Sequence, residues 1–363
     1  MAQQGFKTAS KKSTASATTS APIHPDLSIE GAKTHLNETA KLVFRDPRVR
    51  SVGISKHGDG FGYRAVRNSA MITPESAIVA AALPRNFDLP ITYVDTPHEV
   101  EHQLKVPLSG PGAPTVSSHV LEQGRIRPLA SGLQIQNYDD DVRTGVIAKG
   151  FIIIGTLGCF VNLDNDSVAI LSNNHVVAGE NRGAKGSDRI QQAGSATLVA
   201  GDLVGTLENY IPLKISPVGA SVAAGNALLN QVDAGVAPIG AGVSYKQGFI
   251  PSRSLPVPSG TAGASVGDKV YKVGRTTGLT HGEVKDIATI VGPVGYDPGP
   301  CWFEQSLTIE GDNGTMFSDK GDSGSIIVRN DGKIVGLLYA GNGSQTYACP
   351  IDLVFAALDC KLH

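Results

Sequence analysis

The spacing of apolar residues along this chain changes near residue 130. Within residues 28–45, apolar residues recur at spacings of three and four, which predicts an amphipathic helix: Ile29, Ala32, Leu36, Ala40 and Val43. Ser28 directly precedes this pattern and is a suitable N-cap. The runs VRSVGIS at 48–54 and GFGYRAV at 60–66 flank the turn KHGDG, and they predict a pair of strands.

A second helix and a third strand are predicted farther along the N-terminal part. TPESAIVAAAL at 73–83 has a threonine at the N-cap position and a proline at the first helical position, and LPITYVD at 89–95 predicts a strand. We therefore expect a small α/β domain over residues 28–108. The Ser/Thr/Ala/Lys composition of residues 1–27 predicts a disordered tail, and the Pro, Gly and Ser residues after the domain predict a linker at 109–127.

Beyond residue 130 the chain consists of short β-rich runs separated by glycine-containing turns. Examples are GFIIIGTLGCFV, SVAILSNNHVV and GSIIVRNDGKIVGLLYAG. This pattern predicts an all-β barrel or sandwich. The last periodic segment, PIDLVFAALD at 350–359, has its apolar residues on one helical face and predicts a closing helix.

The composition fits a folded, β-rich protein and limits the classes of partner. The 363 residues are 41% hydrophobic and include 43 glycines, which suits a packed core with many turns. The net charge of −2 predicts no binding to nucleic acid or to an anionic membrane. The longest apolar run, at 151–161, falls short of the roughly 18–20 residues that span a bilayer. The N-terminus lacks the apolar region of a secretory signal, so we expect a cytoplasmic protein.

The four cysteines are widely spaced and form no CxxC pair, which disfavours a zinc site. Free thiols are expected in a reducing compartment. For Cys301 a disulfide with Cys349 or Cys360 is the alternative. The sequence implies neither a metal nor a cofactor.

The segment GDSGS at 321–325 holds a serine between two glycines. A serine hydroxyl is a poor nucleophile unless a base takes its proton, an acid orients that base and N–H donors stabilise the oxyanion. The small neighbours of Ser323 would let the N–H groups of Gly321 and Ser323 converge as an oxyanion hole. The alternative is a simple turn before a strand. The GxSxG elbow of α/β-hydrolases is not matched, because residue 325 is serine.

A base and an acid for this serine are available in the β-rich region. His175 follows the apolar run VAILSNN, and a strand that ends in small polar residues can present an imidazole at a barrel rim; His281 is the competing base. Asp233 lies among alanine, glycine and valine in NQVDAGVAPI, where a buried carboxylate needs a partner such as a histidine. Asp202 and Asp188 have less apolar neighbours and rank lower.

The segments around these residues resemble the catalytic blocks of chymotrypsin-like (trypsin-like) serine proteases. LSNNHVV, VDAGVAP and GDSGSIIV follow one another in the order histidine, aspartate, serine. VGRTTGLTHGEV is similar to a stretch shared by bacterial members, the α-lytic protease and streptogrisin group. The resemblance covers roughly residues 128–360. It implies a mainly β fold of two six-stranded antiparallel β-barrels, at 128–242 and 243–363, the second of which ends in the C-terminal helix.

The same resemblance implies roles for individual residues. His175, Asp233 and Ser323 would form a catalytic triad between the barrels, and the N–H groups of Gly321 and Ser323 would bind the oxyanion. Arg275, in the GRTTG block, would pair with Asp322 and support the oxyanion loop.

Three departures separate the chain from the animal enzymes. Val176 follows the histidine, and Asp319 lies four residues before the serine; the animal enzymes have cysteines of two familiar disulfides at these places. An activation cleavage site before the first barrel is also missing.

The resemblance also implies a substrate pocket formed by residues just before the serine and by the strand after it: Phe317, Ser318, Asp319, Tyr339, Ala340 and Gly341. The residue six places before the serine is an acid in trypsin but Phe317 here, which argues against a preference for lysine or arginine. Asp319 could still reach a cation, and core packing is the alternative role for Phe317. We expect a small or apolar side chain at the P1 position of the substrate.

The sequence therefore predicts a serine endopeptidase that cleaves protein or peptide substrates through an acyl-enzyme. The N-terminal domain would be a propeptide, which inhibits the protease or assists its folding, or it would bind a regulatory protein partner. Whether the chain forms a homo-oligomer is left open by the sequence. The alternatives are a catalytically silent binding module and an esterase. The presence of all three triad residue types disfavours the first, and the missing GxSxG motif disfavours the second.

Overall fold

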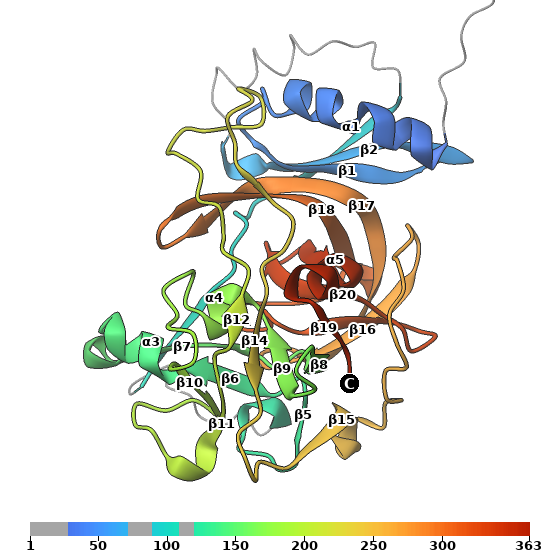
Figure 1. Cartoon of the computed structure of the whole chain (residues 1–363). Helices are drawn as coiled ribbons and strands as arrows, with labels where there is room; N and C mark the ends of the chain where they lie inside the picture. Colours follow the sequence, from blue (N-terminus) through green and yellow to red (C-terminus); the bar gives the residue numbers. More distant parts are fainter. Residues whose placement is uncertain (1–27, 72–88, 109–119) are drawn as a thin grey trace, which may run out of the picture.

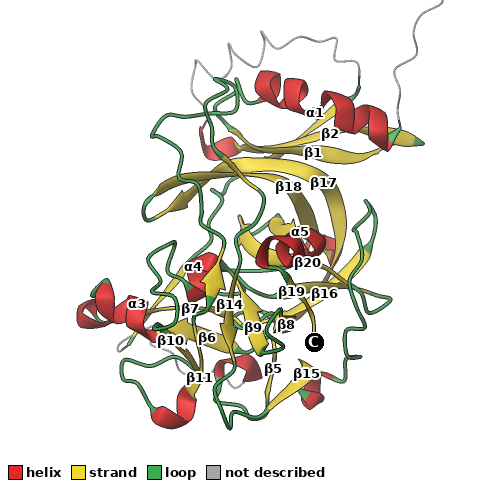
Figure 2. Cartoon of the chain, viewed as in Figure 1, coloured by secondary structure: helices red, strands yellow, loops and turns green. Residues whose placement is uncertain are grey.

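The computed structural model describes residues 28–71, 89–108 and 120–363. Strands dominate this part of the chain, and α1 (Ile29–Val43) is its longest helix (Figure 2). The helix predicted at 73–83, the N-terminal tail and most of the predicted linker lie outside the described residues. No helix of the described part is long and apolar enough to cross a membrane.

The N-terminal strands extend a sheet of the C-terminal half. β1 (Val49–His57) and β2 (Gly60–Asn68) form the predicted antiparallel pair, and β3 (Ile91–Thr96) pairs parallel to β2. β1 also pairs antiparallel with β17 (Gly278–Tyr296). The residues expected to form a small separate domain thus contribute three strands to a ten-stranded sheet, with α1 above β1 and β2 (Figure 1).

The predicted apolar face of α1 is buried. Its N-cap is Ser28, whose Oγ accepts a hydrogen bond from the N–H of Gly31 at 3.0 Å. The buried residues of the helix share one hydrophobic cluster with β17 and β18 (Gly299–Gly311). Just after the helix, Phe44 packs edge-on against Trp302, with 5.2 Å between the ring centroids. Full burial of such a side chain contributes about 1.5–3 kcal/mol, so this packing fastens the N-terminal residues to the C-terminal half.

Six strands of the C-terminal half pair in a closed antiparallel circuit. In order around the circuit they are β16 (Lys269–Gly274), β17, β18, β21 (Thr346–Pro350), β20 (Ile334–Gly341) and β19 (Ile326–Arg329). The predicted C-terminal helix is α5 (Ile351–Leu358), which contacts β20 and β21.

The other half consists of two five-stranded sheets, where the resemblance implied a six-stranded barrel. The first contains, in order, β11 (Leu203–Thr206), β10 (Arg189–Gln192), β6 (Gln134–Asn137), β7 (Phe151–Thr156) and β4 (Leu104–Pro107). The second contains β12 (Asn209–Tyr210), β14 (Gly235–Pro238), β9 (Val168–Ser172), β8 (Cys159–Leu163) and β22 (Cys360–Leu362). β4 and β22 come from outside residues 128–242, so distant parts of the chain complete this half.

The remaining elements are short. They are α3 (Tyr138–Arg143), α4 (Asn174–Val177), β13 (Leu229–Asn230), and the paired strands β5 (Leu129–Ser131) and β15 (Tyr245–Phe249), together with six 3₁₀ turns: Ser69–Met71, Leu121–Gln123, Ile147–Lys149, Ala200–Asp202, Pro251–Arg253 and Asp312–Gly314.

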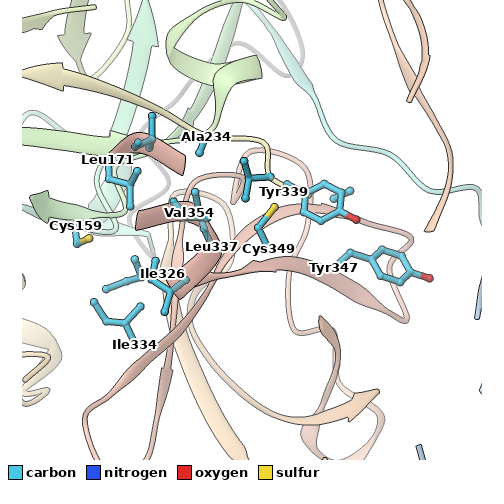
Figure 3. Close-up of a cluster of buried hydrophobic side chains, with 14 of the residues drawn as sticks. Cys159, Leu171, Ala234, Ile326, Ile334, Leu337, Tyr339, Tyr347, Cys349 and Val354 are labelled. Carbon is cyan, nitrogen blue, oxygen red and sulfur yellow. The ribbon is translucent and has the colours of Figure 1, made fainter. Parts of the chain in front are cut away.

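One hydrophobic cluster joins the two halves (Figure 3). Its buried members from the first half and from the second include Cys159, Leu171, Ala234, Ile326, Leu337, Cys349 and Val354. Because Ala234 adjoins Asp233 and Ile326 follows the GDSGS turn, this core holds the two segments in fixed relative positions. All four cysteines are buried and free, so Cys301 forms no disulfide.

Candidate active site

His175 and Asp233 are joined in a buried pair. His175 lies in α4, directly after β9, and Asp233 lies just before β14. β9 and β14 pair antiparallel, with Ser172 opposite Gly235, so the ladder brings the two residues together. His175 Nδ1 lies 2.6 Å from Asp233 Oδ2, and the His175 N–H donates to Asp233 Oδ1 at 3.2 Å. The carboxylate therefore fixes both the ring and the backbone of the histidine.

Two further contacts fix Asp233, one at its carboxylate and one at its backbone carbonyl. The Tyr296 hydroxyl donates to Asp233 Oδ2 at 2.7 Å, and Asn173 Nδ2 donates to the Asp233 carbonyl at 2.7 Å. Burial raises the pKa of Asp233, but the charge of His175 and the hydrogen bonds from His175 and Tyr296 outweigh it and hold the pKa below its ordinary value.

Ser323 lies in a tight turn that requires its glycines. Gly324 has a φ of +95°, and a Cβ on it would lie 2.1 Å from the Thr156 carbonyl oxygen. Thr156 fastens the turn to β7, because its N–H donates to the Ser323 carbonyl and its Oγ1 donates to the Gly321 carbonyl, both at 2.8 Å. Within the described part of the chain, the N–H groups of Gly321 and Ser323 donate no hydrogen bond. They are therefore free to bind an anionic oxygen.

Ser323 and His175 do not hydrogen-bond to each other in this structure. Ser323 Oγ instead donates to the carbonyl of His102 at 2.8 Å, with the Tyr339 carbonyl at 3.4 Å. His175 Nε2 is buried and has no hydrogen-bond partner among the described residues. The ring of His102 lies edge-on to that of His175, with 5.0 Å between centroids, so His102 contacts both residues.

The acid before the serine has a different partner from the one expected. Asp322 pairs with Lys272, with 3.1 Å between Nζ and Oδ2, and both side chains are fully buried. Asp322 also accepts hydrogen bonds from the N–H of Thr276 at 2.7 Å and from the hydroxyl of Thr277 at 2.6 Å. Burial lowers the pKa of Lys272, and the neighbouring charge of Asp322 opposes this shift.

The expected ion pair between Arg275 and Asp322 is therefore not formed. Arg275 Nε donates to Gln134 Oε1 at 2.6 Å, and Arg275 pairs with no carboxylate in the described part of the chain. Burial lowers the pKa of Arg275 to about 10. The backbone explains the difference: the turn after β16 directs the N–H groups of Thr276 and Thr277 at the carboxylate, while Lys272 reaches it from inside the strand. The sequence signal was Lys272, between Tyr271 and Val273 in KVYKVG, because a lysine inside a buried strand needs an acid.

A cavity of about 440 Å³ opens beside Ser323. Four of the expected pocket residues line it: Ser318, Asp319, Ala340 and Gly341. Phe317 and Tyr339 do not line it, because they are fully buried in the hydrophobic clusters. Phe317 is thus a core residue, the alternative role considered for it.

Sequence reasoning missed His102, since histidines of the N-terminal part lie outside the β-rich region. Its ring stacks on Tyr296 at 3.9 Å between centroids, and its Nε2 lies 2.8 Å from Glu180 Oε1. Burial lowers the pKa of His102, against the opposing hydrogen bond of Glu180. No sequence motif predicts that His102 contacts Ser323 and His175, because its position depends on the path of the chain before β4.

The competing candidates lie in other surroundings. His281 is exposed on β17, opposite Tyr271 on β16. Asp202 pairs with Arg125 at 2.5 Å, and Asp188 pairs with Arg143. Across the described residues, no group of three or more His, Cys, Asp or Glu side chains could hold a metal ion.

Comparison with known families and proteins gives one partial match. A family model described as the Nal1 C-terminal domain matches residues 257–348, which span β16 to β20 and include Ser323. No curated protein matches the chain.

Several solved structures are similar to the chain. One is a glutamic acid-specific serine protease that uses a histidine triad in substrate binding, with 16% identity over 65% of this chain and 100% of that chain and a TM-score of 0.43. Others are the chymotrypsin of Cellulomonas bogoriensis, with 18% identity over 57% and 90% and a TM-score of 0.38, and the α-lytic protease homolog N4, with 20% identity over 58% and 93% and a TM-score of 0.39. Because these TM-scores are below 0.5, the likeness to solved structures assigns no functional residues to this chain. The candidate site rests on the distances and hydrogen bonds within the chain itself.

Proposed function

We propose that this chain is a serine endopeptidase in which Ser323 is the nucleophile, His175 the general base and Asp233 the carboxylate that orients the base. The observation that supports this most strongly is the buried Asp233–His175 pair, 2.6 Å apart. It accompanies a serine turn in which, among the described residues, the N–H groups of Gly321 and Ser323 donate no hydrogen bond. A peptide substrate is supported by Gly341, at the end of β20, whose N–H and C=O both hydrogen-bond to another chain segment. A peptide strand binds to a sheet edge in the same way.

In the proposed reaction, His175 Nε2 takes the proton of Ser323 as Oγ attacks the carbonyl carbon of the substrate. Asp233 keeps the histidine proton on Nδ1 and stabilises the imidazolium. The oxygen of the tetrahedral intermediate accepts hydrogen bonds from the N–H groups of Gly321 and Ser323, each worth roughly 3–4 kcal/mol. His175 then gives its proton to the leaving amine, and water releases the acyl group by the reverse route.

A fluorophosphonate probe tests this proposal, because it phosphonylates only an activated serine. We expect the wild type to be labelled once, and Ser323→Ala not to be labelled at all. Ser325→Ala is a matched control in the same turn, since Ser325 is buried and its Oγ donates to the Asp322 carbonyl at 2.6 Å; it should still be labelled. Labelling that persists in Ser323→Ala, or is absent from every Ser323-containing variant, would contradict the proposal.

One observation favours a second candidate, a peptide-binding module without turnover. Ser323 Oγ donates to the His102 carbonyl and not to His175. A module of this kind would bind extended peptides at Gly341 and stay unlabelled by the probe.

A further inference from the structure

Residues 101–107 cross the candidate active site from one half of the molecule to the other. We call this segment the cleft strand. The Glu101 N–H donates to the Gly341 carbonyl at 2.8 Å, and the Gly341 N–H donates to the Glu101 carbonyl at 2.9 Å. After residue 103 the strand becomes β4, which pairs antiparallel with β7. The cleft strand is thus hydrogen-bonded to both halves, and Ser323 contacts it between the two attachment points.

The centre of the cleft strand covers the reactive groups. The His102 carbonyl accepts the hydrogen bond of Ser323 Oγ at 2.8 Å. The ring of the same residue stacks on Tyr296 and meets the edge of His175, and it is 6% exposed. A substrate carbonyl could not reach Ser323 while His102 occupies this position.

Two flanking residues of the cleft strand contact the residues just before Ser323. A Cβ on Gly321 would lie 2.8 Å from Leu104 Cδ2, so Leu104 packs against the glycine whose N–H would bind the oxyanion. Glu101 Oε2 lies 2.6 Å from Lys320 Nζ. Both of these charged side chains are about half exposed, and such a pair contributes at most about 1 kcal/mol. The backbone pairing and the burial of His102 therefore hold the strand.

The cleft strand is held in a geometry that does not lead to its cleavage. Attack requires Ser323 Oγ to approach a carbonyl carbon while the carbonyl oxygen points at the oxyanion donors. Here Oγ donates to the oxygen of His102, and the N–H groups of Gly321 and Ser323 have no acceptor among the described residues. The strand thus occupies the cleft without presenting a bond for attack.

Both ends of the cleft strand are anchored in the fold. On the N-terminal side the chain belongs to β3, which joins the ten-stranded sheet through β2 and β1. On the C-terminal side β4 is the edge strand of a five-stranded sheet. A tethered strand is present at an effective concentration in the millimolar range, so the cleft opens by local displacement of residues 101–103 and not by dissociation of a domain.

We propose that the cleft strand is an autoinhibitory segment: the Glu101–Gly341 pairing and the buried His102 keep the substrate cleft closed, and an extended peptide must displace them to reach Ser323. This inference rests on the proposed endopeptidase function.

Glu101→Pro tests the proposal in the full chain, because proline has no N–H to donate to Gly341. The lost hydrogen bond and the strained pairing should raise the rate of fluorophosphonate labelling at Ser323 about tenfold or more. Glu101→Gln keeps the backbone pairing and removes only the exposed ion pair with Lys320, so its rate should stay within about twofold of the wild type. Leu104→Gly, which uncovers Gly321, is a second variant in case the proline prevents folding. In parallel, hydrogen exchange of the Gly341 N–H, measured in the Ser323→Ala background, reports the opening without any catalysis.

The outcomes separate the two proposals. Faster labelling and faster Gly341 exchange in Glu101→Pro, with Glu101→Gln near the wild type, support autoinhibition. Equal labelling of the wild type, Glu101→Pro and Leu104→Gly overturns autoinhibition and leaves the endopeptidase proposal standing. Faster exchange with no labelling of any variant overturns the endopeptidase proposal, and the inhibitory role with it.

Discussion

Asp233 and Asp322 are two buried carboxylates near Ser323, and they have different hydrogen-bond and ion-pair partners. Asp233 faces a histidine and a tyrosine, and an imidazole held by a carboxylate can act as a general base. Asp322 faces Lys272, the Thr277 hydroxyl and three backbone N–H groups, which hold its carboxylate in place. The first arrangement suits proton transfer, and the second anchors a turn. Burial of an acid beside a serine therefore does not identify the catalytic acid, whereas its partner does.

The largest expected effect is on the chemistry at Asp233. Asp233→Asn would present an amide N–H to His175 Nδ1 and so place the imidazole proton on Nε2, where it blocks transfer from Ser323. Peptide hydrolysis in the Glu101→Pro background, where the cleft is open, should fall by about 10⁴-fold, while the fold is retained through the Tyr296 and Asn173 contacts. Steady-state kinetics with circular dichroism would check this. A loss below tenfold in a folded variant would remove Asp233 from the mechanism.

The next effect concerns stability at Asp322. Lys272→Met leaves that carboxylate buried without its cation, which should lower the free energy of unfolding by about 3–5 kcal/mol. Arg275→Met is the matched control: it loses the hydrogen bond to Gln134, at a cost of about 1.5 kcal/mol. Urea unfolding of both variants distinguishes the two cations. A larger loss in Arg275→Met would mean that the arginine, and not the lysine, supports the serine turn.

Local patterns made parts of this fold predictable. The three- and four-residue spacing of Ile29 to Val43 and of the segment at 350–359 marked α1 and α5, because each helix buries one face. The pairing of β1 with β17 joins segments more than 200 residues apart. Sequence periodicity records which face of a strand is buried but not which strand lies beside it, so the N-terminal residues were expected to form a separate domain.

The candidate site was predictable to a similar degree. The apolar neighbours of Asp233 indicated a buried acid that needs a histidine, and the structure pairs it with His175. The partner of Asp322 was inferred by resemblance, which transferred a role to Arg275 although the chain places a lysine inside the neighbouring strand. The position of His102 depends on the path of the chain before β4 and carries no local signal.

A third buried carboxylate, that of Asp286, should make the stability of the protein depend on pH. Asp286 pairs with Arg64 at 2.7 Å, and Arg64 also contacts Glu310. Burial raises the pKa of Asp286 to about 6, against the opposing charge of Arg64. Because the folded state binds this proton more tightly than the unfolded state, the contribution of Asp286 to stability is greatest below about pH 4 and is lost as the pH rises towards 6.

Asp286→Asn should remove this dependence. Between about pH 4 and pH 6.5 the wild type should lose about 2 kcal/mol of unfolding free energy relative to the variant, measured by chemical denaturation at constant ionic strength. Parallel curves for the two proteins would show that Asp286 stays ionised throughout this pH range.

The central claim, that Ser323 is a nucleophile activated by the Asp233–His175 pair, is tested most directly by mapping the fluorophosphonate adduct by mass spectrometry. The account predicts one adduct, on Ser323, formed slowly in the wild type and faster when the cleft strand is weakened. An adduct on another residue, or none on Ser323 even in Glu101→Pro, would contradict it.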